Sequence, residues 1–591
     1  MAVYPLYKAA TAYNASELDD LDFVQSFDTI YLAHQYYPVS KMVRNDHADW
    51  DFVTVAFEPG IDAPTSVSAV ATVPNTDAAN SGDGYFPQEY SYVVSAVNSD
   101  GQESRGSTPD SATNDTELPR NYTTVSWTAP SGTVEYYRVY KAHESGSFGF
   151  IGETESTSFT DDGFQPDYSD APIEAYNPFD STNEYPARLG FWEQRLWFGR
   201  TVANPNAVFA SRTADFENMD FARPQRENDS IAMSISTGES NVIDAFVPMD
   251  RLLVGTSDNI FSLVGPNDDI LVPSPSPGAK RHVGRGMAGP KPLVVGEVAF
   301  YQPRIETGLR TLGYTFEIDG YKSSDVSIFA PHLFENFRIL RMAYQAEPAS
   351  ILWAVRDDGK LLAFTWEAEQ QVWGWSEMDM GGTVLDVACV PEGEESRVYL
   401  VVERVINEET VRYVEYLDRL KWTDYTLASF LDASRIYAFD EPVTEITGLQ
   451  HLEGEEVKAL ANGYEVDAVV SGGSITLPEL ASNVVVGLPY EAIVETLSLP
   501  EEPKKKITGE IYLELVDSFD VYAGREEDNL ELIATREEGA IGAPILFTGQ
   551  PEPARPDQLV DRDSTIIVKQ TSPYPMTLTA VHYGVEVLGR G

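Results

Sequence analysis

The chain has 591 residues, 42% of them apolar, and its 93 acidic residues outnumber 41 basic ones to give a formal net charge of −52. The apolar content is enough for buried cores and excludes a disordered chain, and the length predicts about three or four domains. A surface this negative repels phosphate groups, which excludes sequence-specific recognition of nucleic acid. A salt-rich environment, a need for solubility and a functional acidic surface are explanations of the charge that the sequence leaves open.

The first residues show no targeting signal. Met1–Ala10 has one charged residue, Lys8, and lacks the apolar stretch of a signal peptide. No apolar run in the chain approaches the roughly 20 residues that a membrane-spanning helix needs. We therefore expect a protein without a membrane span that is made in a cytoplasm.

Residues 1–62 are predicted to hold an N-terminal segment and the first blade of a β-propeller. Asn14, Ser16 and the acidic residues around them are typical of the start of a short helix or turn. Two strands rich in apolar and aromatic residues follow at Thr29–Ala33 and Trp50–Phe57. These strands resemble the blade pattern that recurs later in the chain.

Residues 63–172 are rich in Ser, Thr, Asn, Asp and Gly and contain short strands of alternating polarity. Tyr90–Asn98 is one such strand, and Trp127 is expected to share its core. Pro64, the strand with Trp127 and the Tyr-x-Val-Tyr strand at Tyr137–Tyr140 resemble a fibronectin type III domain. The resemblance implies an inserted β-sandwich without an active site of its own. Because insertions are tolerated at exposed loop tips, we expect the sandwich to project outward.

Residues 173–420 repeat a pattern in which short apolar strands with aromatic residues flank tight turns. Five segments show the pattern, and their core positions recur at intervals of about 50 residues; these positions are Leu196, Leu252, Val298, Leu352 and Val398. The interval is typical of the four-stranded blades of a β-propeller, and we place each residue on the opening strand of its blade. Together with the inferred first blade, the pattern predicts an irregular, six-bladed propeller.

The remaining chain is predicted to form two further β domains, 421–500 and 501–591. The first contains a clear hairpin, Val469–Pro478, around Gly472 and Gly473. The charged stretch Glu501–Lys506 separates the two domains. The expected fold class is therefore mostly β: an irregular β-propeller platform with an inserted β-sandwich and C-terminal β domains.

The sequence nominates no catalytic, metal-binding or cofactor-binding residue. Its seven histidines lack the spacing of a zinc site, and no nucleophile-elbow or P-loop pattern occurs. One Gly-x-Gly-x-x-Gly pattern occurs at 284–289, but the prolines that follow prevent the helix that a dinucleotide site requires. Turns explain the Asp-Asp-Gly triplets at 161–163 and 357–359 better than calcium ligation does.

The tryptophans near residue 374 and the single cysteine have structural explanations. Trp373 and Trp375 fit either packing within a blade or a platform for a sugar ring, and packing is the better explanation. The single cysteine, Cys389, cannot form an intrachain disulfide and is expected to be buried in an apolar strand.

Several long phrases of the sequence resemble the tail nozzle, or tail tubular protein B, of short-tailed bacteriophages. The phrases are Tyr185–Phe221, Asn228–Gly265, Tyr314–Glu335, Met342–Trp375, Val411–Leu420 and His451–Pro478. The resemblance implies a structural virion protein that forms a homo-hexameric ring and, as the distal tail tube, lets double-stranded DNA pass during ejection. It also implies docking on the tail adaptor protein, support of tail fibres or spikes, and no catalytic residues. The fibronectin-like insertion departs from the smallest members of the family.

The resemblance suggests a role for a basic group that is unusual in this acidic chain. Acidic walls of a tube repel passing DNA, and occasional basic residues steady it. Arg281, His282 and Arg285 are therefore candidate lumen or gate residues. The Gly- and Pro-rich stretches Asn267–Gly289 and Glu537–Asp561 are candidate gate loops. A plain surface loop is the alternative for each stretch.

A carbohydrate-binding or glycoside-hydrolase propeller is the alternative function. A glycosidase needs two carboxylates that face each other across a cleft, and among 93 acidic residues no pair stands out. The Asp-box of sialidases is echoed only by Asp358, Gly359 and Trp366, at the wrong spacing. We therefore expect a non-enzymatic protein of the virion tail, assembled in the host cytoplasm.

Overall fold

A computed structural model describes residues 9–76, 85–144, 146–173, 177–235, 241–266, 270–305, 307–419, 421–498, 506–533, 535, 543–555, 560–561 and 565–587. Regular structure in these residues consists of antiparallel strands and short 3-10 helices. The predicted fold class, mostly β with blade-like sheets, a sandwich and C-terminal β domains, is confirmed. The chain divides into two compact units, one of them Pro5–Phe329 and the other Ala330–Gly591 with Met1–Tyr4.

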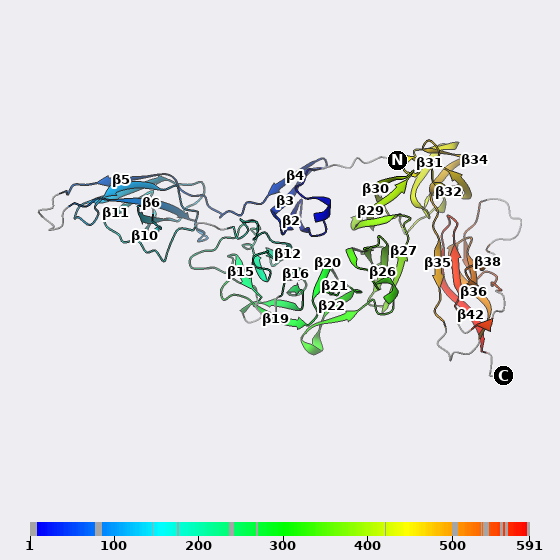
Figure 1. Ribbon diagram of the computed structural model, residues 1–591. Helices are drawn as coiled ribbons and strands as arrows, with labels where there is room; N and C mark the ends of the chain where they lie inside the picture. Colours follow the sequence, from blue (N-terminus) through cyan, green and yellow to red (C-terminus); the bar gives the residue numbers. More distant parts are fainter. Residues whose placement is uncertain are drawn as a thin grey trace. The chain divides into compact units, whose positions relative to one another are not determined.

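The unit Pro5–Phe329 contains four blade-like sheets, each with four strands that pair in chain order (Figure 1). The strands are β1 (Asp22–Ser26), β2 (Thr29–His34), β3 (Tyr37–Asp46) and β4 (Asp49–Thr54); β12 (Arg188–Trp192), β13 (Arg195–Gly199), β14 (Ala207–Ala210) and β15 (Ile231–Ser234); β16 (Ile243–Pro248), β17 (Leu252–Thr256), β18 (Ile260–Val264) and β19 (Gly278–Val283); and β20 (Met287–Val295), β21 (Val298–Pro303), β22 (Arg310–Thr315) and β23 (Gly320–Asp325). The expected N-terminal helix is a single 3-10 turn, η1 (Ala15–Glu17), in which Glu17 accepts a hydrogen bond from the backbone N–H of Asn14 at 2.8 Å.

These four sheets pack side by side through their first strands. β1 lies against β12, β12 against β16, and β16 against β20. The first two sheets share one apolar core, although residues 63–172 separate them in the sequence. In that core the rings of Phe57 and Phe198 lie 5.6 Å apart, and Phe179 contacts both. The insertion therefore leaves the packing of the neighbouring sheets intact.

Residues 63–172 contain two sheets that enclose a common core. The strands are β5 (Thr65–Thr72), β6 (Gln88–Val97), β7 (Asp110–Asn114), β8 (Tyr122–Thr128), β9 (Tyr136–His143), β10 (Gly149–Thr154) and β11 (Ser158–Asp161). Their orders are β11-β8-β5 and β10-β9-β6-β7. Tyr92 of β6, Trp127 of β8 and Tyr137 of β9 meet in the core, and the last two rings lie 5.1 Å apart. This arrangement is a β-sandwich with Trp127 in its core, as the sequence predicts; the kinship to fibronectin type III remains a prediction.

The second unit contains two more blade-like sheets. The strands are β24 (Ile339–Gln345), β25 (Ile351–Arg356), β26 (Leu361–Glu367) and β27 (Val372–Met378), then β28 (Thr383–Glu392), β29 (Glu395–Ile406) and β30 (Glu409–Tyr416). β24 lies against β28, and the two sheets share a core that includes Trp353, Val387 and Leu400. The predicted hairpin at 357–359 joins β25 to β26, with Gly359 at a φ of 83°. Cys389, on β28, is half-buried at the edge of this core, and burial raises the pKa of its thiol to about 12.

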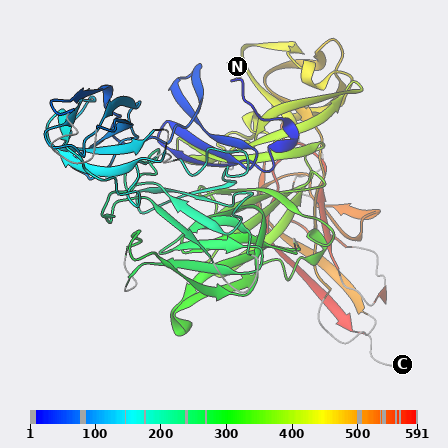
Figure 2. The same ribbon diagram turned by 60° about the vertical axis from the view of Figure 1, so that its left-hand side comes forward.

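The rest of this unit forms three further sheets. The strands are β31 (Asp432–Thr447), β32 (Glu456–Ala461), β33 (Tyr464–Val469) and β34 (Ser474–Leu488), followed by β35 (Ala492–Glu495), β36 (Lys506–Ser518), β37 (Tyr522–Glu526), β38 (Asn529–Leu532), β39 (Phe547–Gly549), β40 (Val560–Asp561), β41 (Ile567–Gln570) and β42 (Thr577–Val587). The predicted glycine turn joins β33 to β34, and both Gly472 and Gly473 have positive φ. β36 and β42 pair over most of their length (Figure 2).

The recurring core residues of the blade pattern lie on the second strand of each sheet, which corrects their expected place on the opening strand. Leu196 is on β13, for example, and Val398 is on β29. A second strand has a strand on each side and packing on both faces, so it carries the longest apolar run. All five residues of β13 are buried, whereas three of the five residues of β12 are only half-buried.

Candidate functional site

The predicted lumen or gate residues lie on and just after β19, the outermost strand of its sheet (Figure 1). Arg281 is opposite Phe261 on β18. From Met287 onward the chain is again a strand, β20, which pairs with β21. The stretch Asn267–Gly289 is therefore strand over much of its second half, where a loop was expected; 267–269 lie outside the described residues. An edge strand tolerates the Gly- and Pro-rich composition because only one of its sides must pair. In the second candidate gate, Glu537–Asp561, residues 537–542 and 556–559 also lie outside the described residues.

The side chain of His282 packs against neighbouring side chains and does not project into solvent as Arg281 does. Its Nε2 lies 2.9 Å from the Oγ of Ser262, and its ring packs edge-on against Tyr321 with centroids 5.2 Å apart. Burial lowers the pKa of His282, and the positive charges of Lys280 and Arg251 lower it further. The side chain is therefore neutral at physiological pH and acts as a packing element between β19 and β23.

Arg281 and Arg285 are exposed, as is Lys280 beside them. Within the described part of the chain, these three side chains form no ion pair. In the adjoining sheet, by contrast, Arg304 and Arg310 are each paired with an aspartate. The structure thus presents three uncompensated cations here, an arrangement suited to weak contacts with phosphate groups that do not depend on sequence.

The glycine pattern at 284–289 has a structural role in this connection. A Cβ at Gly286 would collide with the backbone carbonyl of Ser257, and Gly289 has a φ of 76°. The chain can therefore pass from β19 to β20 only with glycine at these positions. A strand, β20, follows these glycines instead of a helix.

A second group of charged residues, which the sequence reasoning missed, lies on the first strands of the sheets. Lys291 Nζ on β20 lies 2.8 Å from Asp22 Oδ1 on β1. Arg188 Nε on β12 donates to the carbonyl oxygen of Asp244 on β16 at 2.7 Å, and Arg200 pairs with the Asp244 carboxylate at 2.8 Å. Burial raises the pKa of Asp244, and the positive charges of Arg200 and Arg188 oppose this shift.

The second unit repeats this arrangement. Arg341 on β24 and Asp386 on β28 form an ion pair of 3.8 Å. The sequence does carry a signal for these charged residues. Each stands alone in a short strand that is otherwise uncharged, as in Asp-Phe-Val-Gln-Ser of β1 and Arg-Leu-Gly-Phe-Trp of β12. Because protein groups satisfy these charges, the set is suited to holding first strands together rather than to binding a ligand.

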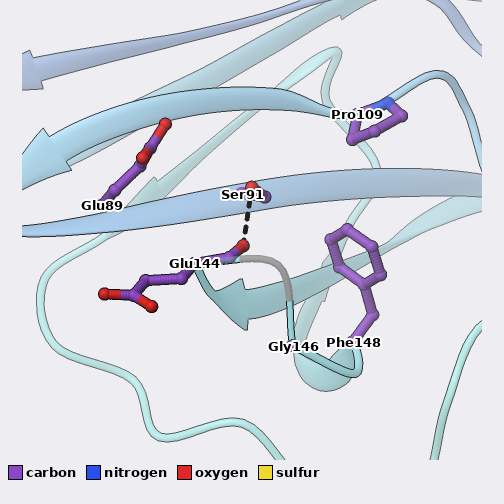
Figure 3. Close-up of a pocket in the computed structure, with 6 residues that line it drawn as sticks. All are labelled: Glu89, Ser91, Pro109, Glu144, Gly146 and Phe148. Atoms are coloured by element: carbon purple, nitrogen blue, oxygen red, sulfur yellow. Dashed lines mark hydrogen bonds between the residues drawn. The ribbon is translucent and has the colours of Figure 1, made fainter.

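A surface hollow of ≈ 530 Å³ lies on the sandwich and is lined by Glu89, Ser91, Pro109, Glu144, Gly146 and Phe148 (Figure 3). Ser91 Oγ donates to the backbone carbonyl of Glu144 at 3.3 Å, which links β6 to the chain beyond β9. The carboxylates of Glu89 and Glu144 are exposed at its rim. The hollow is open to solvent, and its polar groups do not converge on a single point (Figure 3).

The two tryptophans of β27 differ in burial. Trp375 is half-buried and stacks on Phe364 with ring centroids 4.4 Å apart, as the packing explanation predicts. Trp373 is 46% exposed and lies 5.7 Å from the ring of Trp366. Only Trp373 could therefore offer a face to a ligand.

The described residues contain no group of three or more His, Cys, Asp or Glu residues placed to hold a metal ion. In the same part of the chain, no helix has both the length and the apolar character needed to cross a bilayer.

No protein-family model matches the chain, and no curated protein matches it. Solved structures that resemble it include a periplasmic gluconolactonase of Pseudomonas aeruginosa, with 11% identity, coverage of 56% of this chain and 99% of that chain, and a TM-score of 0.26. The lectin SapL1 in complex with alpha methyl fucoside has 14% identity, coverage of 47% and 92%, and a TM-score of 0.22. A luciferin-regenerating enzyme has 6% identity, coverage of 39% and 74%, and a TM-score of 0.24.

Proposed function

We propose that this chain is a structural protein of a short-tailed phage virion, a subunit of the ring that forms the distal tail tube, or nozzle. The proposal rests on where the sequence segments that resemble the nozzle family lie in the fold. Tyr185–Phe221 holds β12 to β14, Asn228–Gly265 holds β15 to β18, and Met342–Trp375 runs from within β24 into β27. The likeness thus involves the strands of successive blade-like sheets and is not confined to one loop.

The charge of the chain supports the passage of DNA rather than its retention. A formal charge of −52 opposes stable binding of phosphate groups along the wall of a tube. The exposed Arg281, Arg285 and Lys280 provide a small cationic area for transient contacts with the DNA backbone. In this proposal these residues face the lumen, and His282 holds β19 against the next sheet.

The proposed partners follow from the same role. They are other copies of this chain in a homo-hexameric ring, the tail adaptor protein, tail fibres or spikes, and the DNA in transit. The inserted sandwich is a self-contained element with its own core, and this independence suits a docking platform for fibres or spikes.

The mass and symmetry of the purified protein test the proposal. Mass photometry and negative-stain imaging would be applied to the protein alone and to the protein mixed with the adaptor ring of the same phage. Six-fold rings, formed alone or only on the adaptor, are the expected result. A persistent monomer that ignores the adaptor would overturn the proposal and favour a glycan-binding propeller, for which the exposed Trp373 would be the first residue to examine.

A further inference from the structure

A lysine and an aspartate face each other inside the inserted sandwich. Lys141 is on β9, in the sheet β10-β9-β6-β7, and Asp161 ends β11, in the sheet β11-β8-β5. Lys141 Nζ lies 2.7 Å from Asp161 Oδ2, and the two side chains are 3% and 0% exposed. Charged side chains are rarely buried this completely, because the loss of hydration can cost more than one ion pair returns. The pair therefore invites a chemical explanation.

Both oxygens of the Asp161 carboxylate accept hydrogen bonds. The backbone N–H groups of Gly163 and Phe164 donate to Oδ1 at 3.1 and 2.9 Å. The hydroxyl of Tyr92, on β6, donates to Oδ2 at 2.8 Å. Gly163 has a φ of 112°, so the turn at 161–163 needs glycine to direct these N–H groups at Oδ1. Two backbone donors on one carboxyl oxygen are the arrangement that stabilises the oxyanion of acyl transfer.

The surroundings of Lys141 hold its amine against this carboxyl group. Nζ donates to the backbone carbonyl of Phe164 at 3.2 Å and lies 4.1 Å from the centre of the Tyr90 ring. These contacts fix the position of Nζ beside Oδ2, which is one bond from the carbon that an amine would attack. In an apolar core, an ammonium group and a carboxylate can become neutral by transfer of one proton. The lone pair on Nζ is then free to act as a nucleophile.

We propose that Lys141 and Asp161 condense to an isopeptide bond, with no other protein and no cofactor taking part. After the proton transfer, Nζ attacks Cγ, and negative charge develops on Oδ1 between the two backbone N–H groups. Tyr92 gives its hydroxyl proton to Oδ2 and recovers one from Nζ. The Nζ–Cγ bond forms, the Cγ–Oδ2 bond breaks, and Oδ2 leaves as water. Of the three ammonium hydrogens, one stays on the amide nitrogen and two leave with the water.

Tyr92 is suited to this proton transfer. Burial raises the pKa of its hydroxyl, and the charge of Asp161 raises it further, so the proton that it donates is present. The product removes two buried charges and joins the two sheets of the sandwich covalently. Such a cross-link stabilises the sandwich by restricting its unfolded state. The proposal is independent of the function proposed above.

The intact mass of the full-length protein tests the proposal. The native chain should be lighter than its sequence requires by the mass of one water molecule. Lys141→Arg keeps a cation beside Asp161 but removes the nucleophilic amine, so this variant should have the full mass of its sequence. A native chain with the full mass of its sequence would overturn the proposal, as would an equal loss of water from Lys141→Arg.

A peptide map identifies where the water is lost, because Asp162 precedes Gly163 and an Asp-Gly pair also loses water when it closes to a succinimide. Trypsin would be combined with a protease that cleaves after glutamate, which cuts between Lys141 and Asp161 at Glu153. The isopeptide bond then gives a branched peptide that joins the two segments, whereas a succinimide stays in a linear peptide. The branched peptide supports the proposal, and loss of water in the linear peptide alone would overturn it.

A matched pair of tyrosine variants tests the catalytic part of the proposal. Tyr92→Phe keeps the buried ring but removes the hydroxyl, so condensation should slow about a hundredfold or more, and the purified variant should be largely uncondensed. Tyr140→Phe removes another buried hydroxyl of the same sheet, one that donates to Glu103, and should be condensed like the native chain. Equal condensed fractions in the two variants would overturn the step assigned to Tyr92.

Discussion

Lys291 and Asp22 are 269 residues apart in the sequence, yet their side chains form an ion pair of 2.8 Å that joins β20 to β1. The same Asp22 carboxylate accepts a hydrogen bond from the backbone N–H of Leu189 on β12 at 2.8 Å. One buried carboxylate thus connects the first strands of three sheets. The inserted β-sandwich separates β1 from β12 in the chain, so these bonds help to keep the sheets together across it.

Replacing Lys291 with Met should lower the free energy of unfolding by about 1–3 kcal/mol, because a carboxylate would remain buried without its cation. The Lys291 side chain is 42% exposed and that of Asp22 is 8% exposed, so the effect should fall toward the lower end of this range. Urea unfolding followed by tryptophan fluorescence measures the change. Arg44→Met removes an exposed ion pair with Asp28 and is the control, with an expected change below about 0.5 kcal/mol. Similar losses in the two variants would contradict the role given to Asp22.

Asp220 should make stability depend on pH. Burial raises its pKa from 3.8 to about 7, against the opposing effects of the Phe221 backbone N–H and Arg212. Because the pKa is higher in the folded state than in the unfolded state, the stability that Asp220 contributes is fully present below pH 3.8. It is lost as the pH rises toward 7 and is constant above that value.

Asp220→Asn removes this proton linkage and keeps an oxygen for the Phe221 N–H, which Asp220 Oδ1 accepts at 2.5 Å. The stability of the variant relative to the native chain should therefore rise between pH 4 and 7, by at most about 1.4 kcal/mol per pH unit. Unfolding curves recorded across this range measure the difference. Parallel pH profiles for the two proteins would show that Asp220 does not titrate there.

The blade pattern was predictable because the second strand of each sheet combines two buried faces with tight flanking turns. Leu196-Trp197-Phe198 on β13 shows the resulting apolar run. The same logic misplaced these residues by one strand, since a first strand such as β12 is less fully buried than the second strand beside it. The order of the strands in the sandwich could not be predicted from the sequence either. For example, β5 pairs with β8, which lies far along the chain, and the pairing uses backbone groups that do not depend on residue type.

Proximity in the sequence misled the prediction of the basic site. Arg281 and His282 are adjacent residues, but the register between β18 and β19 shifts here, so that Arg281 is opposite Phe261 whereas His282 has no partner in the ladder. His282 is consequently packed against Tyr321, while Arg281 remains exposed. The pairing of Lys291 with Asp22 could not be inferred either, because it depends on which sheets become neighbours in space.

Gly359 should be more sensitive to substitution than another glycine with the same backbone preference. Gly359 and Gly393 have φ angles of 83° and 68°. A Cβ at Gly359 would collide with Thr383, whereas a Cβ at Gly393 meets nothing within 4 Å. Gly393→Ala should cost about 1 kcal/mol for the left-handed conformation alone, and Gly359→Ala about 2–4 kcal/mol because the collision adds to that cost. Thermal unfolding of both variants measures the difference, and equal costs would show that the β25–β26 turn moves away from Thr383 freely.

The exposed arginines of the β19 edge should determine what weak affinity the protein has for DNA. At low salt the native chain should bind a short duplex weakly, and the affinity should fall steeply as salt is added. Arg281→Ala combined with Arg285→Ala removes two phosphate contacts, so the slope of log K against log salt should decrease in magnitude by about 2. His282→Gln is the matched control and should leave the slope unchanged, because burial and the nearby cations lower the pKa of His282 and keep it neutral. Fluorescence anisotropy over a range of salt concentrations measures both slopes. If the double variant has the same slope as the native chain, Arg281 and Arg285 do not contact the DNA. If His282→Gln lowers the slope as much as the double variant does, His282 carries a positive charge in solution.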